Sequence, residues 1–567
     1  MAKLTRSDLN FVLQQILIAE AHAAGRPLAD LIDNPFDSLG LRTVDGSYNN
    51  LVPGQQQLGA ADELFPRLLA PVYQNEQDEA PIDLNGPAPG GILTNTDYAA
   101  AGSVIDSDPR TISNLISDQT ITNPAAVRAF VDAGLGTFVV NAAGMAVVHY
   151  LNDDGTTGAV VPNSVTLTIP NTSPDEGLSA SFNSWFTLFG QFFDHGLDLV
   201  AKGGNGTVFI PLAADDPLRT HGLDGIAGNG DEVAPQNAFM AVTRTTPFPG
   251  DAALNTTTSF VDQNQTYTSH PSHQVFLREY VLDANGRPVA TGHLLDGATG
   301  GLPSWAEIKA QAAARLGIAL TDADITNLPM VRTDAYGKFI PATDRVNPAE
   351  NGFAQVIIGA GADGVLNTSD DIVRVGTPAT PIDTFAVVAL RTDHAFLDDI
   401  AHAAAPRFSS GALAGQMKAE DTDNVINGDR NGNGVIDNGE IAVAGSNFYD
   451  NELLNAHFIT GDGRGNENIG LTAVHHVFHS EHNRQVEEIK ATALASGDLA
   501  FINEWLRVDV AAIPANTATL QWDGERLFQA ARFATEMQYQ HLVFEEFARK
   551  VSPNVDAFLA PIGYDTT

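Results

Sequence analysis

The sequence predicts a mainly α-helical protein in which long irregular loops and a few short β-strands connect the helices. Apolar residues recur every three or four positions over long stretches, which is the spacing of a helix with one buried face. The connections are rich in Gly, Pro, Asn and Asp, which favour turns. The expected helices are 5–24, 124–134, 179–200, 304–316, 394–403, 471–495, 499–511 and 523–550. The expected strands are 137–140, 146–150, 164–169, 355–358 and 372–375.

The first and third helices differ in character. Residues 9–24 mix apolar side chains with Asn, Gln and Glu, which indicates an amphipathic helix, whereas residues 179–200 are strongly apolar and rich in Phe and Leu. The third helix is therefore expected to be buried. No stretch between the elements is typical of a linker, so residues 1–567 are expected to form a single domain.

The composition excludes several classes of protein. The 567 residues include 30 Lys and Arg against 69 Asp and Glu, a formal charge of −39. This charge argues against a nucleic acid or an anionic membrane as partner and favours bound cations, Ca²⁺ above all. The absence of cysteine excludes disulfides, thiolate catalysis, iron–sulfur clusters and Cys-ligated zinc.

The first residues lack the charged and apolar regions of a conventional signal peptide. No uninterrupted apolar run has the length that a membrane span needs. An acidic, cysteine-free chain with calcium loops is expected to be extracellular, with export that needs no cleaved signal.

Two loops, near 221–232 and 361–371, share a pattern in which an acidic pair follows an Asp-Gly turn by seven residues. Carboxylates on a tight turn suit Ca²⁺, although ordinary acidic surface turns have the same composition. The candidate ligands are Asp224, Asp231, Asp363 and Asp370.

A third loop, 429–440, fits the twelve-position EF-hand calcium loop, with glycine at its sixth position. We expect a structural calcium here, because no paired helix–loop–helix sensor is evident. The candidate ligands are Asp429, Asn431, Asn433, Val435, Asp437 and Glu440.

The apolar helix 179–200 contains three polar residues, Gln191, Asp194 and His195. Burying them without partners would cost about 1–3 kcal/mol for each group and more for a charge. Gln191 and His195 are four residues apart and share one helical face. Either Asp194 and His195 pair at a helix end, or these residues form the wall of a buried cofactor pocket.

A second polar group, Arg464 and Glu467, directly precedes the helix at 471–490. If this turn faces residues 191–195, a histidine lies beside a fixed cation. That arrangement suits peroxide cleavage, because the imidazole can move a proton between the two oxygens while the guanidinium stabilises the developing charge.

Together these segments resemble the animal-type haem peroxidases of the peroxidase–cyclooxygenase superfamily, in particular its bacterial branch. The fold that the resemblance implies is a peroxidase-like helical domain. The segments that carry it occur in the family's order and are 42–51, 190–198, 258–267, 464–484 and 522–532.

The resemblance implies a role for each polar residue. His195 matches the distal histidine, Gln191 the distal glutamine and Arg464 the catalytic arginine. Asp194 and Glu467 match the carboxylates that form esters with haem methyl groups in mammalian members. The implied cofactor is haem b, ester-linked or free. The implied reaction is reduction of hydrogen peroxide with oxidation of small donors, namely halides, phenols or Mn²⁺.

The resemblance also implies a calcium loop tied to the distal helix. Its ligands would be Thr258, Phe260, Asp262, Asn264 and Gly196. Asn264 stands where the family has serine, and Gly196 stands where mammalian members have an aspartate ligand. This site is therefore expected to bind calcium more weakly, or to recruit water or Asp198.

Three histidines, His475, His479 and His482, share one face of the 471–495 helix and could ligate a metal. In the family this helix packs beside the haem without ligating iron, so packing is the favoured interpretation.

The family's proximal histidine has no counterpart at the expected position. The one histidine after Trp522 is His541, on the preceding helix. We therefore expect the chain to be the N-terminal portion of a longer protein, with a C-terminal fragment or chain completing the haem site.

Two alternatives stay open. One is a fatty-acid dioxygenase or cyclooxygenase-like enzyme, which needs a radical-forming tyrosine on the proximal side. The other is a non-catalytic, calcium-binding extracellular scaffold. The carboxylates Asp194 and Glu467 favour the peroxidase.

Overall fold

The computed structural model describes residues 4–32, 41–65, 98–99, 101–105, 136–140, 146–150, 183–212, 214–222, 227–234, 238–245, 253–401, 404–408, 413–421, 424, 426 and 447–551. The chain divides into two compact units. Unit 1 comprises residues 1–66, 182–199 and 254–567, and unit 2 comprises residues 67–181 and 200–253. That both belong to one domain, as the sequence analysis expects, stays a prediction.

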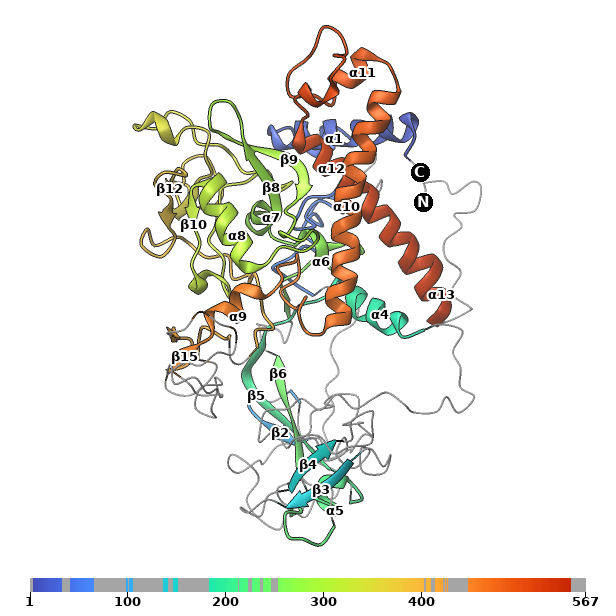
Figure 1. The fold of residues 1–567 in the computed structure, drawn as a ribbon, viewed down its shortest axis with the longest axis vertical. Coiled ribbons are helices and arrows are strands. Elements are labelled where there is room, and N and C mark those ends of the chain that lie inside the picture. Colours follow the sequence, from blue (N-terminus) through green and yellow to red (C-terminus); the bar gives the residue numbers. More distant parts are fainter. Residues whose placement is uncertain are drawn as a thin grey trace. The chain divides into compact units, whose positions relative to one another are not determined.

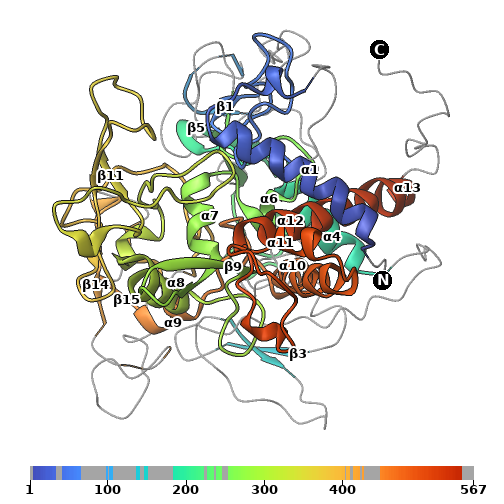
Figure 2. The same ribbon diagram turned by 90° about the horizontal axis from the view of Figure 1, so that it is seen from above.

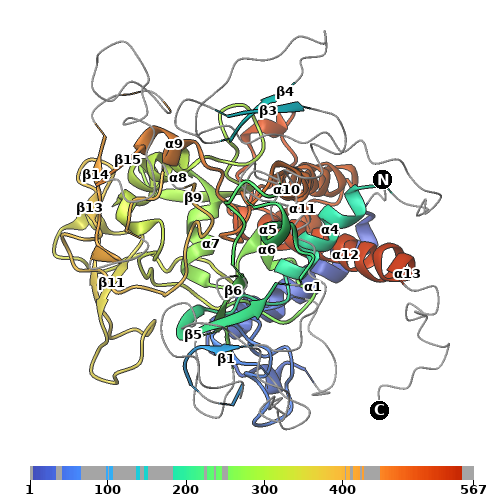
Figure 3. The same cartoon turned by 90° about the horizontal axis from the view of Figure 1, so that it is seen from below.

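Unit 1 is mainly helical, as predicted. Its two long helices, α10 (Ile469–Ala495) and α12 (Gly524–His541), lie side by side, and α1 (Arg6–Ala23) packs against both (Figures 1 and 2). Seen from below, α4 (Trp185–His195) lies next to α10 and α12 (Figure 3). The other α-helices are α6 (Asn264–Tyr267), α7 (Pro271–Leu277), α8 (Trp305–Gln311), α9 (Asn451–Ala456), α11 (Leu499–Asn503) and α13 (Ala548–Val551).

The helices begin where polar side chains bind their first free amides. Thr5 and Asp8 form a capping box at the start of α1. The Asp523 carboxylate accepts from two amides at the start of α12, and the Asn468 side chain accepts from Leu471 N at the start of α10.

Two apolar clusters stabilise unit 1. In the first, Leu9 and Val12 of α1 pack with Val486 of α10, Leu527 of α12 and Trp505, all buried. The second cluster consists of other aromatic and aliphatic residues, among them Phe276, Trp305, Phe396, Tyr449 and Phe528. The long helices therefore belong to a continuous helix-on-helix core.

The strands of unit 1 are short and form separate two-stranded pairs. β8 (Arg278–Leu282) and β9 (Pro288–Leu294) are an antiparallel hairpin in which Tyr280 faces Ala290. The other antiparallel pairs are β1 (Glu63–Leu64) with β7 (Leu254–Asn255) and β11 (Val356–Gly359) with β12 (Ile372–Arg374). The parallel pairs are β10 (Ile318–Ala319) with β13 (Ile382–Asp383) and β14 (Ala419–Glu420) with β15 (Phe448–Tyr449).

Unit 2 contains a three-stranded sheet in the order β2 (Val104–Ile105), β5 (Lys202–Pro211), β6 (Phe239–Thr245). β5 runs parallel to β2 and antiparallel to β6. A hairpin of β3 (Gly136–Val140) and β4 (Ala146–Tyr150) and the short helix α5 (Pro217–Thr220) belong to the same unit.

Most predicted elements are confirmed. The helices expected at 5–24, 304–316, 471–495 and 523–550 are present, the second and the last with a π-helical segment each. Those segments are Ala312–Leu316 and Leu542–Phe547, and the 3₁₀ turns are Leu28–Asp30, Asp322–Asp324, Pro348–Glu350 and Thr517–Thr519. The expected strands are found except 164–169, which lies outside the described residues, as does helix 124–134.

Three helix predictions need correction. The helix expected at 179–200 is shorter in the described part of the chain, where α4 begins at Trp185 and ends at His195. The helix expected at 394–403 is not present in residues 394–401, the described part of that segment. The backbone hydrogen bonds there are long-range, because Phe396 N donates to Ile325 O and Asp398 N donates to Gly463 O. The helix expected at 499–511 ends at Asn503, and Arg507 N donates to Gln521 O instead. None of the described helices is long and apolar enough to span a membrane.

The start of α12 lies so close to β9 that it requires glycine. A Cβ on Gly524 would lie 1.8 Å from the carbonyl oxygen of Ala290, which is backbone and cannot swing away. Gly524→Ala should therefore lower the free energy of unfolding by about 1–3 kcal/mol, as overpacking does. Urea unfolding followed by circular dichroism checks this. Gly359→Ala is the matched control, because its Cβ meets only Ile372 at 3.5 Å; equal losses in both variants would contradict the prediction.

Candidate functional site

Aromatic packing fixes α4 against the start of α10. Phe192 is fully buried, stacks on Phe478 with ring centroids 5.0 Å apart, and meets Tyr539 edge-on at 5.8 Å. A Cβ on Gly470 would lie 2.5 Å from Leu188 Cδ1, so the Leu188 side chain of α4 packs directly against the α10 backbone there. This contact brings the turn at 464–468 to residues 191–195, as the sequence analysis proposed.

His195 is buried and held by a carboxylate. Its Nδ1 lies 2.7 Å from Asp462 Oδ2, and its Nε2 lies 3.5 Å from Glu467 Oε2. Because an ionised carboxylate only accepts hydrogen bonds, the geometry assigns the proton of the neutral ring to Nδ1. The lone pair of Nε2 is then left to accept a proton.

Asp462 also binds Arg464. Its Oδ1 accepts from Arg464 Nε at 2.9 Å, and Arg464 Nη2 donates to the carbonyl oxygen of His195 at 2.9 Å. Burial raises the pKa of Asp462, but the hydrogen bond with His195 and the positive charge of Arg464 outweigh it, and the pKa lies below its usual range. One ionised carboxylate therefore orients both the histidine and the arginine.

Gln191, Glu467 and Asn468 continue the network. Gln191 Nε2 donates to Glu467 Oε2 at 2.7 Å, and Asn468 Nδ2 donates to Gln191 Oε1 at 2.9 Å. The Glu467 side chain is 39% exposed. The structure thus brings Gln191, His195, Arg464 and Glu467 together from two distant parts of the chain.

The expected burial of Asp194 is wrong. Asp194 is exposed and Gln191 is half-buried, while His195 alone of the three is buried. The charged carboxylate stays in water, where it needs no partner. The pair of Asp194 and His195 that the sequence left open is replaced by the pair of His195 and Asp462.

Further carboxylates surround this network. The backbone of Asp398 is bonded to Gly463 O at 2.8 Å, and both carboxylate oxygens of Asp399 are buried without a hydrogen-bond partner in the described part of the chain. Burial raises the pKa of Asp399 to about 7, and the charges of Glu467, Asp462 and Asp398 act in the same direction.

Amide side chains hold the end of α4. Gln265 Nε2 donates to Phe192 O at 2.6 Å, and Asn255 Nδ2 donates to Leu197 O at 3.1 Å. Asn264 Nδ2 donates to Gly196 O at 2.8 Å. Three carbonyls at or just after the helix end are therefore satisfied by side chains from residues 255–265.

Residues of the predicted calcium loop lie together. Asn264 Nδ2 is 2.8 Å from Thr258 Oγ1 and 3.0 Å from Asp262 Oδ1, and all three residues are buried. The ring of Phe260 packs where Gly46 and Gly59 lack side chains. Calcium binding by this loop stays a prediction.

Two of the three histidines that share one face of α10 have separate hydrogen-bond partners, whereas neither ring nitrogen of His475 has one in the described part of the chain. His479 Nε2 is 3.0 Å from Asp296, and the two ring nitrogens of His482 lie within 3.0 Å of Tyr267 Oη and Gly292 O. His475 is buried against Phe192. Burial lowers the pKa of His482 to about 3 and that of His475 to about 4, so both are neutral.

The other predicted calcium loops stay predictions. The EF-hand-like ligands Asp429, Asn431, Asn433, Val435, Asp437 and Glu440, and also Asp224, lie outside the described residues. Asp231 is exposed. In the loop at 361–371, Asp370 accepts from Asp363 N at 3.2 Å and from Thr368 Oγ1 at 2.7 Å, so its carboxylate closes the turn.

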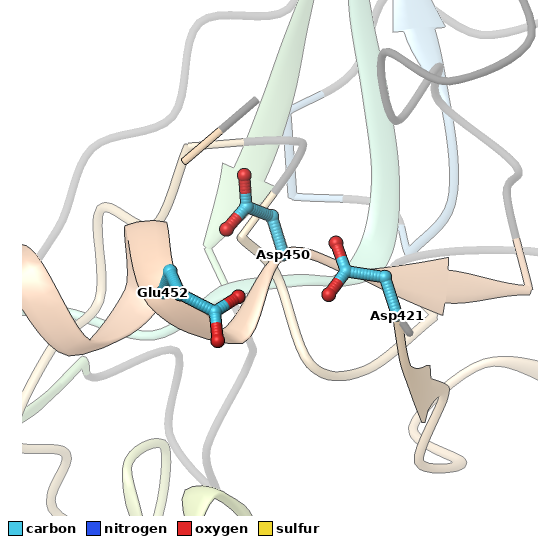
Figure 4. A group of neighbouring side chains, drawn as sticks. All are labelled: Asp421, Asp450 and Glu452. Carbon is cyan, nitrogen blue, oxygen red and sulfur yellow. The ribbon is translucent and has the colours of Figure 1, made fainter. Parts of the chain in front are cut away.

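In the described part of the chain, one group of three carboxylates could hold a metal ion. Single oxygens of Asp421, Asp450 and Glu452 lie within 4.8 Å of one another (Figure 4). Acidic clusters of this kind are also common without an ion.

The comparison with protein families agrees with this geometry. The family model "Animal haem peroxidase" matches residues 407–557. This part of the chain is therefore similar to the animal haem peroxidases. The match includes Asp462, Arg464 and Glu467 and the whole of α10 and α12, whereas α4 precedes it. No curated protein matches the sequence.

The sequence analysis did not find Asp462, which the structure places at the centre of the network. Its position two residues before Arg464 was the available signal, because a carboxylate on a tight turn can bind a nearby guanidinium. Asp399 was missed as well, since it lies in the segment wrongly expected to be helical.

Asp462→Asn should lower the free energy of unfolding at pH 7 by about 3 kcal/mol, because it leaves Arg464 without its buried counter-charge. The folded pKa of Asp462 lies below the unfolded value, so this contribution is present above about pH 4 and is lost as the pH falls. Urea unfolding from pH 7 to pH 3 should show the difference from wild type shrinking. The exposed Asp194→Asn is the control, and a difference that is independent of pH would contradict the assignment.

Asp399→Asn should stabilise the protein at alkaline pH. Because the folded pKa of Asp399 is raised to about 7, the parent protein loses stability as the pH rises from about 4 through 7, whereas asparagine does not ionise. Thermal unfolding should show a higher midpoint for the variant at pH 8 and equal midpoints at pH 4. A variant less stable than the parent at pH 8 would show that the carboxylate has a stabilising partner.

Proposed function

We propose that the protein is a haem-dependent peroxidase that reduces hydrogen peroxide while oxidising halide, phenolic or Mn²⁺ donors. One observation carries the proposal: a buried histidine with its Nδ1 held by a carboxylate lies beside Gln191, Glu467 and a fixed arginine. The animal haem peroxidase match over the segment that supplies Arg464 and Glu467 supports the cofactor.

The described residues fit the distal side of a haem. Asp194 is exposed and the Glu467 side chain is 39% exposed, so both carboxylates are accessible to a bound group. We propose that these two residues hold haem b, either through ester links to the macrocycle or without them. A bound haem would supply the iron that exchanges electrons with peroxide.

The protein's own groups would move the protons. His195 Nε2 can take a proton from one peroxide oxygen and return it to the other, because Asp462 keeps the Nδ1 proton in place and stabilises the imidazolium that forms. Gln191 can orient peroxide or water through its amide. Arg464 is fixed by Asp462 and by the His195 carbonyl, so its positive charge is preorganised beside the site.

We propose that a C-terminal fragment or another chain would complete the haem site. The His541 side chain is 69% exposed, and its Nδ1 lies 2.9 Å from Glu545 Oε1 on the same helical stretch. In the described part of the chain, His541 makes no contact with Gln191 or Glu467. We also propose an extracellular location, which the acidic, cysteine-free composition supports; type I secretion is the route that the resemblance to bacterial relatives implies.

His195→Ala should leave haem uptake intact and slow the reaction with peroxide by about 10²–10⁴-fold, the usual contribution of a general acid–base group. The protein is loaded with hemin, together with the complementing segment where needed, and the Soret change on adding peroxide is followed by stopped flow. His476→Ala, an exposed histidine on α10, is the control.

Equal rates in His195→Ala and the parent would disprove the catalytic role. Failure of the parent to take up haem at all would favour the non-catalytic scaffold. Acid–ketone extraction of the loaded protein tests the ester links, because covalently held haem stays with the protein.

A further inference from the structure

We infer that the side-chain amide of Asn264 replaces the calcium ion of the related enzymes, so that the loop at 258–264 holds the end of the distal helix α4 without a metal. The loop attaches to Gly196, the residue directly after His195. The inference concerns this loop alone and does not depend on haem binding or on the proposed activity.

The first argument is the position of the amide nitrogen. Asn264 Nδ2 lies 2.8 Å from Gly196 O, 2.8 Å from Thr258 Oγ1 and 3.0 Å from Asp262 Oδ1. These three oxygens belong to the residues that would ligate calcium. Gly196 O and Asp262 Oδ1 only accept hydrogen bonds, and of the two amide atoms only the nitrogen can donate to them. The NH₂ group therefore serves as the positive partner at this point.

The second argument is that hydrogen-bond donors within the loop already bind the carboxylate oxygens of Asp262. Asp262 Oδ2 accepts from the Thr258 hydroxyl at 2.7 Å, and Asp262 Oδ1 accepts from Asn264 N at 3.2 Å as well as from Nδ2. Calcium needs six to eight oxygen ligands that turn lone pairs toward it. Here the carboxylate and the hydroxyl turn them toward hydrogen atoms.

The third argument is charge. Among the candidate ligands Asp262 supplies the one carboxylate, because position 196 is glycine. A Cβ on Gly196 would lie 2.1 Å from Gln265 Nε2. That amide is fixed by bonds to Phe192 O at 2.6 Å and Tyr539 Oη at 2.8 Å, so an aspartate at 196 has no room. The site has lost a negative charge and gained a donor in the same place.

Asn264→Asp tests the inference, since it exchanges the NH₂ donor for a second carboxylate of the same shape. Because other loops of the chain are candidate calcium sites, the quantity compared is the difference in bound calcium per chain. It is measured by mass spectrometry of the metal after dialysis of the full chain against calcium. Thr258→Val, which removes one candidate ligand, is made in both backgrounds.

Wild type and Thr258→Val should bind the same number of calcium ions, and Asn264→Asp should bind one more. The double variant Asn264→Asp/Thr258→Val should return to the wild-type number. Loss of one ion in Thr258→Val alone would overturn the inference, because the wild-type loop would then hold calcium.

A crystal of the wild-type protein soaked in Tb³⁺ gives a test that needs no variant. No anomalous peak among Gly196 O, Thr258 Oγ1 and Asp262 supports the inference. A peak at that position, with Asn264 Oδ1 turned toward it, overturns it.

Discussion

The carboxylate of Asp462 binds two groups that the candidate site needs, Nδ1 of His195 and the guanidinium of Arg464. Burying one ion costs several kcal/mol, and this cost is offset only when geometry and hydrogen bonding are nearly complete. Both oxygens of Asp462 are bonded, and Arg464 reaches on to the His195 carbonyl. Asp462 thus links the His195 ring to Arg464, and Arg464 links back to the His195 backbone. None of these groups can move without breaking a charge-assisted bond.

The end of α4 extends this unit. Its carbonyls are bonded by Gln265, Arg464 and Asn264, which come from two separate parts of the chain. Amide and guanidinium groups are suited to this because each presents several fixed donors. The helix is therefore held in register at His195, while its other end rests on aromatic packing.

The helices α10 and α12 were predictable because their apolar spacing persists over many turns, and local capping residues agree with it. The segment 394–401 has a similar composition, but its amides bond to Ile325 and Gly463, far away in the chain. Gln191, His195, Arg464 and Glu467 were recognisable by residue type and order. Asp462 was not, since it is one of 69 acidic residues and binds His195 across 267 positions. Burial of Asp194 was mispredicted because an apolar segment still has one face in water.

In the sequence, the two segments of unit 2, residues 67–181 and 200–253, directly precede and follow the stretch that contains α4. Neither flank of this helix connects it directly to the remainder of unit 1. In thermodynamic terms α4 behaves as a ligand that is tethered to the other helices of unit 1. The fraction of molecules in which it is bound depends on its effective concentration and on the bonds that hold it. Loop length changes that concentration only slowly. Weakening those bonds by about 1.4 kcal/mol would therefore raise the fraction of molecules in which α4 is dissociated about tenfold.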